Sequence, residues 1–184
     1  ERELAEMLLT KLNRPKQAIQ HLRSVLEAAP GDSGALNRIK EAQAALGDWD
    51  GYVGSLVHEL GMLLGKPGAD ADSLLALDPE SVATPLRVPA SQIIADIAHV
   101  TELELAQAEH AHRLWGLVYR LWPEHAEALE RRIDLDRKLN QHEDLARDLE
   151  RYADLLLDAE ERFKVLVESA RLHAETLNDN ESAR

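Results

Sequence analysis

Several features that would indicate a particular chemistry are missing from this chain of 184 residues. It contains no cysteine, which excludes disulfide bonds, thiolate catalysis and cysteine-ligated zinc. Aromatic residues make up only 4% of the chain. No apolar run approaches the roughly 18 residues that a membrane-spanning helix needs, and no secretory signal peptide is visible. The cytoplasm is therefore the favoured location.

Positive charge is also scarce: the chain has 21 basic and 34 acidic residues, which give a net charge of −13. A surface this acidic repels the phosphate backbone of nucleic acids and anionic lipid head groups. We expect neither nucleic acid nor a membrane surface as a partner, whereas basic or apolar protein segments would fit. The same excess of charge is also explained by solubility alone.

The residues that are abundant favour helices. Apolar residues account for 45% of the chain and charged residues for 30%. Much of the chain is Ala, Leu, Glu and Arg, which lose little rotamer freedom in a helix. This composition allows a sizeable core beneath a well-solvated surface, and it predicts an all-α protein.

A short frame recurs along the chain: a Leu, five mostly polar residues, then a small or apolar residue. The first and second copies start 34 residues apart, as do the third and fourth. The second and third are 59 apart, which is 25 more than one period, and the last two are 38 apart. A period of 34 is typical of a two-helix solenoid repeat, whose units bury their apolar faces only against neighbours. The copies start at Leu12, Leu46, Leu105, Leu139 and Leu177.

The frame divides the chain into three segments. Residues 1–64 hold two predicted helical hairpins, and residues 90–184 hold the third, the fourth and the first helix of a fifth. Residues 65–89 carry four prolines and two glycines, which predict an insertion without a long helix. Because this insertion is rich in Leu and Val, we expect it to be ordered against the solenoid, with a short helix near Ala71–Leu77; a disordered linker is the alternative.

The second helices carry a small residue, a bulky residue and a closing proline at fixed spacing. Ala18, Leu22 and Pro30 form one set, and Ala111, Trp115 and Pro123 form another. Together with LGDWDGY after an Ala-rich helix, this pattern resembles the tetratricopeptide repeat. The resemblance implies a right-handed α-solenoid of antiparallel helix hairpins, with about 4.5 repeats and one insertion. The small residue that the family places inside the first helix is replaced here by Glu6, Lys40, His99, Ile133 and Arg171.

In tetratricopeptide solenoids the first helices line a concave face that binds an extended peptide or a helix. The resemblance therefore implies a protein-interaction scaffold without catalytic activity. An alternative is a regulatory or substrate-docking segment of an enzyme whose catalytic domain lies outside this chain. A clamp for a chaperone tail is disfavoured, because acidic residues interrupt the basic ones. The partner-binding residues implied are Asn37, Arg38, Glu41, Glu130, Arg131, Asp134, Lys138, Glu168 and Leu172.

The chain has few candidates for a chemical site. Glu109 and His112 share one helix face, but a di-iron bundle site needs a second such motif and two further carboxylates. We therefore interpret this pair as solvated surface and predict no metal, no cofactor and no catalytic residue; no glycine-rich phosphate loop is present either. Trp115 is predicted to lie in the core. Trp49 is predicted to be half-buried in the turn between repeats, and Trp122 precedes the helix-ending Pro123; either could serve as a partner anchor.

The two ends carry a further expectation. The chain opens on Glu1 without a methionine and closes inside a turn, so we interpret it as an excerpt of a longer protein. The final helix, from Phe163 to Leu177, then lacks its hairpin partner. Its uncovered apolar side makes self-association through the truncated repeat end an expected property.

Overall fold

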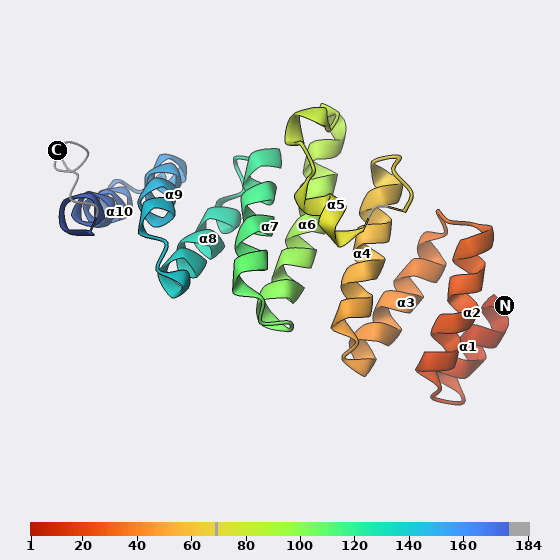
Figure 1. Cartoon of the computed structure of the whole chain (residues 1–184). Coiled ribbons are helices and arrows are strands. Elements are labelled where there is room, and N and C mark those ends of the chain that lie inside the picture. Colours follow the sequence, from red (N-terminus) through yellow and green to blue (C-terminus); the bar gives the residue numbers. More distant parts are fainter. Residues whose placement is uncertain (69, 177–184) are drawn as a thin grey trace.

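The computed structural model describes residues 1–68 and 70–176. Throughout these residues every regular element is a helix, and the helices follow one another in a single row that places the two ends of the chain far apart (Figure 1). Each of the long helices packs against the next long helix along the chain. The predicted all-α solenoid of helix hairpins is confirmed. None of the described helices is long and apolar enough to cross a lipid bilayer.

Within the described residues, four helix hairpins are followed by one more α-helix. The first helix of each hairpin is α1, α3, α6, α8 or α10, and the second is α2, α4, α7 or α9. The bounds are Arg2–Thr10 (α1), Pro15–Ala28 (α2), Ser33–Leu46 (α3), Trp49–Leu63 (α4), Thr84–Leu103 (α6), Ala108–Leu121 (α7), Ala126–Leu139 (α8), His142–Leu155 (α9) and Ala159–Arg171 (α10). The handedness of the solenoid and the repeat count stay predictions.

Local sequence signals explain where the helices begin and end. The carboxylates of Asp32 and Asp48 accept hydrogen bonds from backbone N–H groups at the starts of α3 and α4, over 3.0 and 3.1 Å. Such caps satisfy donors that the helix itself leaves unpaired. Gly47 and Asn140 follow α3 and α8 in the left-handed conformation, with φ of 65° and 56°. This conformation closes a helix, and glycine and asparagine adopt it most readily.

The insertion is ordered where the structure describes it. It contains the short helix α5 (Ala71–Leu75) and the 3₁₀ turn η1 (Pro79–Ser81), and Leu77 and Val82 are buried in the central core. The predicted short helix is therefore confirmed. The expectation that this segment holds no part of a long helix is wrong, because α6 begins at Thr84 rather than near residue 90.

Two prolines near the start of α6 explain this difference. Pro85 lies in the first turn of the helix, where the N–H group that proline lacks would be unpaired in any case. Pro89 lies inside the helix, one turn further on, where its ring removes a single backbone hydrogen bond. The same helix packs four buried apolar residues against its neighbours, and this burial outweighs the lost hydrogen bond. They are Ala90, Ile94, Ile97 and Ala98.

The buried apolar residues form three clusters of unequal size. The largest joins α4, α6 and α7 with the insertion and contains Trp115, whose exposed fraction is 0%, as predicted. A second joins α1, α2 and α3. A third and much smaller one contains Ile133, Leu145 and Leu149, with Tyr152, Val165 and Leu172 packed against it.

The last helices leave apolar side chains uncovered. Phe163 and Leu166 on α10 are 67% and 40% exposed. The α-helix ends at Arg171 and continues as the π-helical segment η2 (Leu172–Thr176), which packs against α9 and α10. Leu177, with the last copy of the recurring frame, lies outside the described residues. Self-association through this end stays a prediction.

Candidate functional site

Successive first helices present their polar side chains to one another. Within the described residues, ion pairs join Glu6 of α1 to Arg38 of α3 over 3.5 Å, Glu102 of α6 to Arg131 of α8 over 3.0 Å, and Arg137 of α8 to Glu168 of α10 over 2.8 Å. These contacts require the polar sides of the paired helices to lie next to each other. We call this surface the first-helix face.

The structure brings most of the predicted partner-binding residues to exposed positions on these helices. Asn37 and Glu41 of α3 are exposed, as are Glu130 and Asp134 of α8. Arg38, Glu41, Asp134 and Glu168 take part in ion pairs with neighbouring side chains, but pairs at the surface are weak and exchange with solvent. Their side chains are therefore accessible to a partner.

Three of the predicted residues also have structural contacts. Arg131 and Lys138 approach the carboxylate of Glu102 over 3.0 and 3.8 Å, and the side chain of Glu102 is only 5% exposed. The same carboxylate accepts a hydrogen bond from Trp115 Nε1 over 3.2 Å. Leu172 is half-buried against the small apolar cluster at the end of the row. These side chains stabilise packing between repeats, whatever else they bind.

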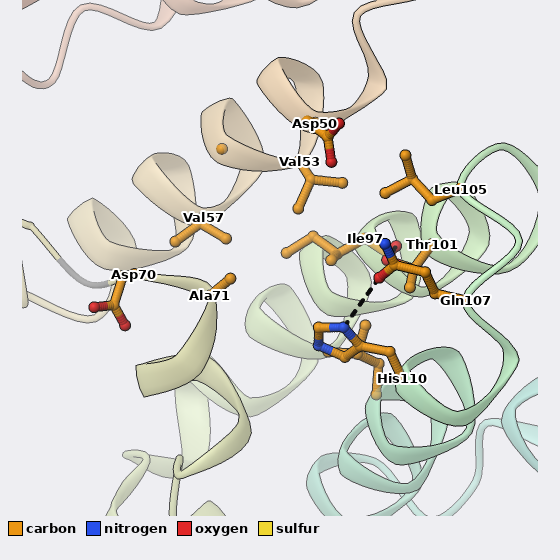
Figure 2. Close-up of a pocket in the computed structure, with 12 residues that line it drawn as sticks. Asp50, Val53, Val57, Asp70, Ala71, Ile97, Thr101, Leu105, Gln107 and His110 are labelled. Atoms are coloured by element: carbon orange, nitrogen blue, oxygen red, sulfur yellow. Dashed lines mark hydrogen bonds between the residues drawn. The ribbon is translucent and has the colours of Figure 1, made fainter.

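A cavity lies where the insertion interrupts the solenoid. It has a volume of about 350 Å³ and is bounded by α4, α5, α6 and α7. Figure 2 shows Val53 and Val57 of α4 on one side and Ile97, Thr101 and His110 on the other. Cavities of this size, mostly apolar with a few polar groups, are typical of small-ligand sites.

The polar groups of this cavity are modest. His110 Nδ1 lies 3.3 Å from Gln107 Oε1, and burial, followed by the nearby charge of Arg113, lowers the pKa of His110. A lowered pKa keeps the imidazole neutral near pH 7, so it can accept or donate one hydrogen bond. No nucleophile or acid–base pair converges on it among the described lining residues.

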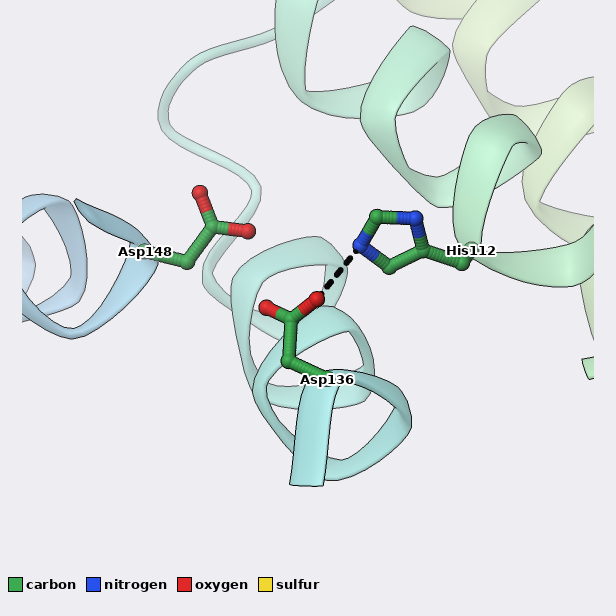
Figure 3. Close-up of side chains that lie close together, drawn as sticks. All are labelled: His112, Asp136 and Asp148. Atoms are coloured by element: carbon green, nitrogen blue, oxygen red, sulfur yellow. Dashed lines mark ion pairs between the residues drawn. The ribbon is translucent and has the colours of Figure 1, made fainter. Parts of the chain in front are cut away.

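A second group of polar side chains is buried between α7, α8 and α9. Figure 3 shows His112 of α7 facing Asp136 of α8, with Asp148 of α9 beside them; His112 Nε2 and Asp136 Oδ1 lie 2.7 Å apart. Both aspartates are fully buried. Arg132 Nε donates to Asp148 Oδ2, and Arg151 donates to Asp148 Oδ1 over 3.2 Å. We call these five residues the polar junction.

The polar junction has the residue types of a metal site but not the arrangement. One ligand atom from each of His112, Asp136 and Asp148 lies within 4.8 Å of the others. However, both oxygens of Asp148 already accept from arginines. A divalent cation would have to displace one guanidinium and would lie beside another positive charge. The residues therefore fit an ion-pair network better than a metal centre.

Sequence reasoning missed this network. The expectation that His112 lies on solvated surface is wrong, since its exposed fraction is 8%. His110 and His112 point to different sides of α7, one to the cavity and one to α8 (Figures 2 and 3). The signal that could have found the network is Gly116 in the middle of α7, because a glycine there costs about 1 kcal/mol relative to alanine. Any Cβ at Gly116 would collide with the guanidinium of Arg132.

Similarity to known proteins is found among solved structures. No protein-family model matches the chain, and no curated protein does. MamA is similar over 97% of this chain and 87% of its own, at 13% identity and a TM-score of 0.47. A MamA RS-1 ArsTM double mutant is similar over 99% and 86%, at 18% identity and a TM-score of 0.46. TTC0263, a thermophilic TPR protein in Thermus thermophilus, is similar over 99% and 84%, at 17% identity and a TM-score of 0.32. The description of the fold rests on the helices and contacts given above.

Proposed function

We propose that this chain is a protein-interaction scaffold that binds a peptide or a helix of a partner on its first-helix face. The observation that carries the proposal is the set of accessible polar side chains on α3, α8 and α10, whose polar sides lie next to those of neighbouring first helices. On a surface built from successive repeats, each repeat can contact a different part of a long partner segment.

The negative charge of the first-helix face favours a basic or amphipathic partner segment. Asn37, Glu41, Glu130 and Asp134 are exposed acceptors on this face, and the chain as a whole carries a net charge of −13. A segment with lysine or arginine between apolar residues would approach faster and form charge-assisted hydrogen bonds there. We therefore favour a basic or amphipathic segment over an acidic one.

A display library of random peptides, selected on the chain, tests the proposal. We expect the enriched peptides to be basic, and their binding to weaken at least about tenfold in the variant Asn37→Ala/Glu41→Ala/Asp134→Ala, since hydrogen bonds to charged groups contribute about 1.5–3 kcal/mol each. The matched control is Gln20→Ala/Glu27→Ala/Glu143→Ala, which removes the same charge from exposed positions of second helices. Equal weakening by both variants would contradict a site on the first-helix face.

A second candidate is a docking or regulatory segment of a larger enzyme. The described residues that line the 350 Å³ cavity include no nucleophile with a base, which supports catalysis elsewhere if the parent protein is an enzyme. Sequencing the full reading frame separates the two candidates. A fused catalytic domain favours the second, and further repeats alone favour the first.

A further inference from the structure

A pocket lined by arginines opens beside the polar junction. It has a volume of about 470 Å³ and lies between α7, α8 and α9. Four arginines line it, together with His112 and a single carboxylate, that of Asp144. Asp144 is itself paired with Arg147 over 2.7 Å. The pocket shares no residue with the partner-binding set predicted for the first-helix face. Its arginines are Arg113, Arg120, Arg132 and Arg151.

Arg132 is fixed at the inner wall of this pocket. Its side chain is 14% exposed, and its Nε is committed to Asp148. The terminal nitrogens of its guanidinium donate to no acceptor among the described residues. Gly116 leaves the space that the guanidinium occupies, since a larger residue would collide with it. The result is a nearly buried cation, held in one orientation, with donors to spare.

Arg151 of α9 lines the same pocket and shares the Asp148 carboxylate with Arg132, although its side chain is 43% exposed. It donates to Asp148 over 3.2 Å, and its guanidinium carbon lies 5.5 Å from the ring centroid of Tyr119. A contact of this kind between a guanidinium and an aromatic face restricts the side chain without using its donors. Asp148 and Tyr119 thus orient two arginines toward the same space.

The other two arginines are uncommitted. Arg113 and Arg120 lie on α7 and are exposed, and in the part of the chain that the structure describes neither has a carboxylate at ion-pair distance. The guanidinium fork matches the oxygens of phosphate, and several forks are needed to balance a dianion.

We propose that this pocket is an oxyanion site that takes a phosphate group, either as free inorganic phosphate or as a phosphate monoester on a partner segment. Arg132 and Arg151 form its preset inner wall, and Arg113 and Arg120 close over the ligand from α7. The volume suits a phosphate with a few attached atoms. The acidic surface elsewhere repels a long polyanion, so nucleic acid is not the ligand.

Calorimetric titration of the whole chain tests the proposal with three probes: inorganic phosphate, an alanine-based heptapeptide with one central phosphoserine, and the same peptide with glutamate instead. We expect saturable binding of the phosphate probes and weaker binding of the glutamate peptide. The variant Arg113→Gln/Arg120→Gln should weaken phosphate binding at least about tenfold, because each arginine contributes charge-assisted hydrogen bonds. Both residues are exposed, so its melting temperature should match that of the unmodified chain.

Arg14→Gln/Arg23→Gln is the control, since it removes two exposed arginines from the first hairpin. Phosphate binding that survives in the control and is lost in the Arg113/Arg120 variant supports the site. A phosphopeptide that binds far tighter than inorganic phosphate assigns the ligand to a partner segment, and equal affinities assign it to free phosphate.

Three results would overturn the proposal. The first is the absence of saturable phosphate binding. The second is equal weakening by both pairs of substitutions, which would indicate only a general effect of net charge. The third is binding of the glutamate peptide, or of a short single-stranded RNA, as tight as that of the phosphopeptide.

Discussion

Two neighbouring junctions of this solenoid are built in opposite ways. Between α4 and α7 the helices meet through apolar side chains, with Trp115, Ile94 and Leu114 almost or fully inaccessible to water. Between α7 and α9 the helices also meet through the polar junction: only Ala128 and Leu135 of α8 belong to the central apolar cluster, and the cluster beyond has three buried members.

The apolar junction contributes mainly to stability, whereas the polar junction contributes mainly to the specificity of helix packing. Apolar burial stabilises roughly in proportion to its area and tolerates small shifts between helices. Buried ion pairs contribute little net stability, because removing charge from water costs several kcal/mol. They do penalise any arrangement that leaves a charge unpaired. We infer that the central junction holds the row together and that the polar junction fixes how α7, α8 and α9 are aligned.

The largest expected loss of stability follows a substitution in the apolar junction between α4 and α7. Trp115→Ala should lower the free energy of unfolding by about 3–5 kcal/mol, because it empties a fully buried position. Denaturation by urea, followed by circular dichroism, measures this loss. Trp49→Ala, at a half-buried position at the start of α4, should cost less. Equal losses at the two positions would contradict a dominant central core.

Breaking the polar junction should have the next largest effect. Asp148→Ala leaves Arg132 buried without a counter-charge, which should cost about 3 kcal/mol; Arg151 is partly exposed and can turn to solvent. The matched control is Asp154→Ala on the same helix, where the carboxylate is 75% exposed and meets Arg162 at 3.4 Å. We expect the control to change the free energy of unfolding by less than about 1 kcal/mol.

A smaller effect is expected at the edge of the polar junction. The Tyr152 hydroxyl donates to Glu130 Oε1 over 2.7 Å, and this bond, with burial and the charge of Glu130, raises the pKa of Tyr152 to about 12. Tyr152→Phe should cost about 1 kcal/mol near neutral pH. The bond favours the neutral phenol, so its contribution is complete below the ordinary pKa of about 10. It is lost as the pH rises from there through about 12.

Absorbance titration of the phenolate and chemical denaturation at pH 8 and above follow this effect. Tyr52→Phe is the control, because its hydroxyl makes no hydrogen bond within the described residues. A cost for Tyr152→Phe that stays constant up to about pH 12 would show that Glu130 does not hold the proton on the phenol.

The smallest expected effect sharpens the distinction between the junctions. His112→Leu/Asp136→Leu replaces the buried pair by apolar side chains, and the free energy of unfolding should stay within about 1 kcal/mol of the original value. His112→Leu alone leaves the fully buried Asp136 unpaired and should cost about 3 kcal/mol or more. If the double variant lost as much as the single one, the pair itself would be a source of stability.

Much of the fold could be predicted because its signals are local. The spacing of the recurring frame, the caps at Asp32 and Asp48, and Gly47 after α3 depend only on nearby residues. The prediction misplaces the start of α6, because it treats Pro85 and Pro89 as helix breakers. Burial against α4 and α7 overrides that local preference.

The polar junction could not be predicted in the same way. Arg132, Asp136 and Asp148 each fall among charged neighbours in the sequence, where a solvated helix surface is the usual outcome. Their burial depends on how α7, α8 and α9 pack together, and Gly116 of α7 leaves the space that the Arg132 guanidinium occupies. The partner-binding residues stay a prediction, because exposure alone does not identify what they contact.

The single row of helices also determines how the chain reaches its structure. Because each long helix packs against the next long helix along the chain, few contacts join distant parts of the chain, and proteins of low contact order fold rapidly. α5 and η1 also contact α7, which lies only a few dozen residues further along the chain. Together with α4 and α6 these elements form the central core. We expect folding to begin there and to spread toward both ends. Amide hydrogens of α6 and α7 should then exchange most slowly, and those of α1 and α10 should exchange first.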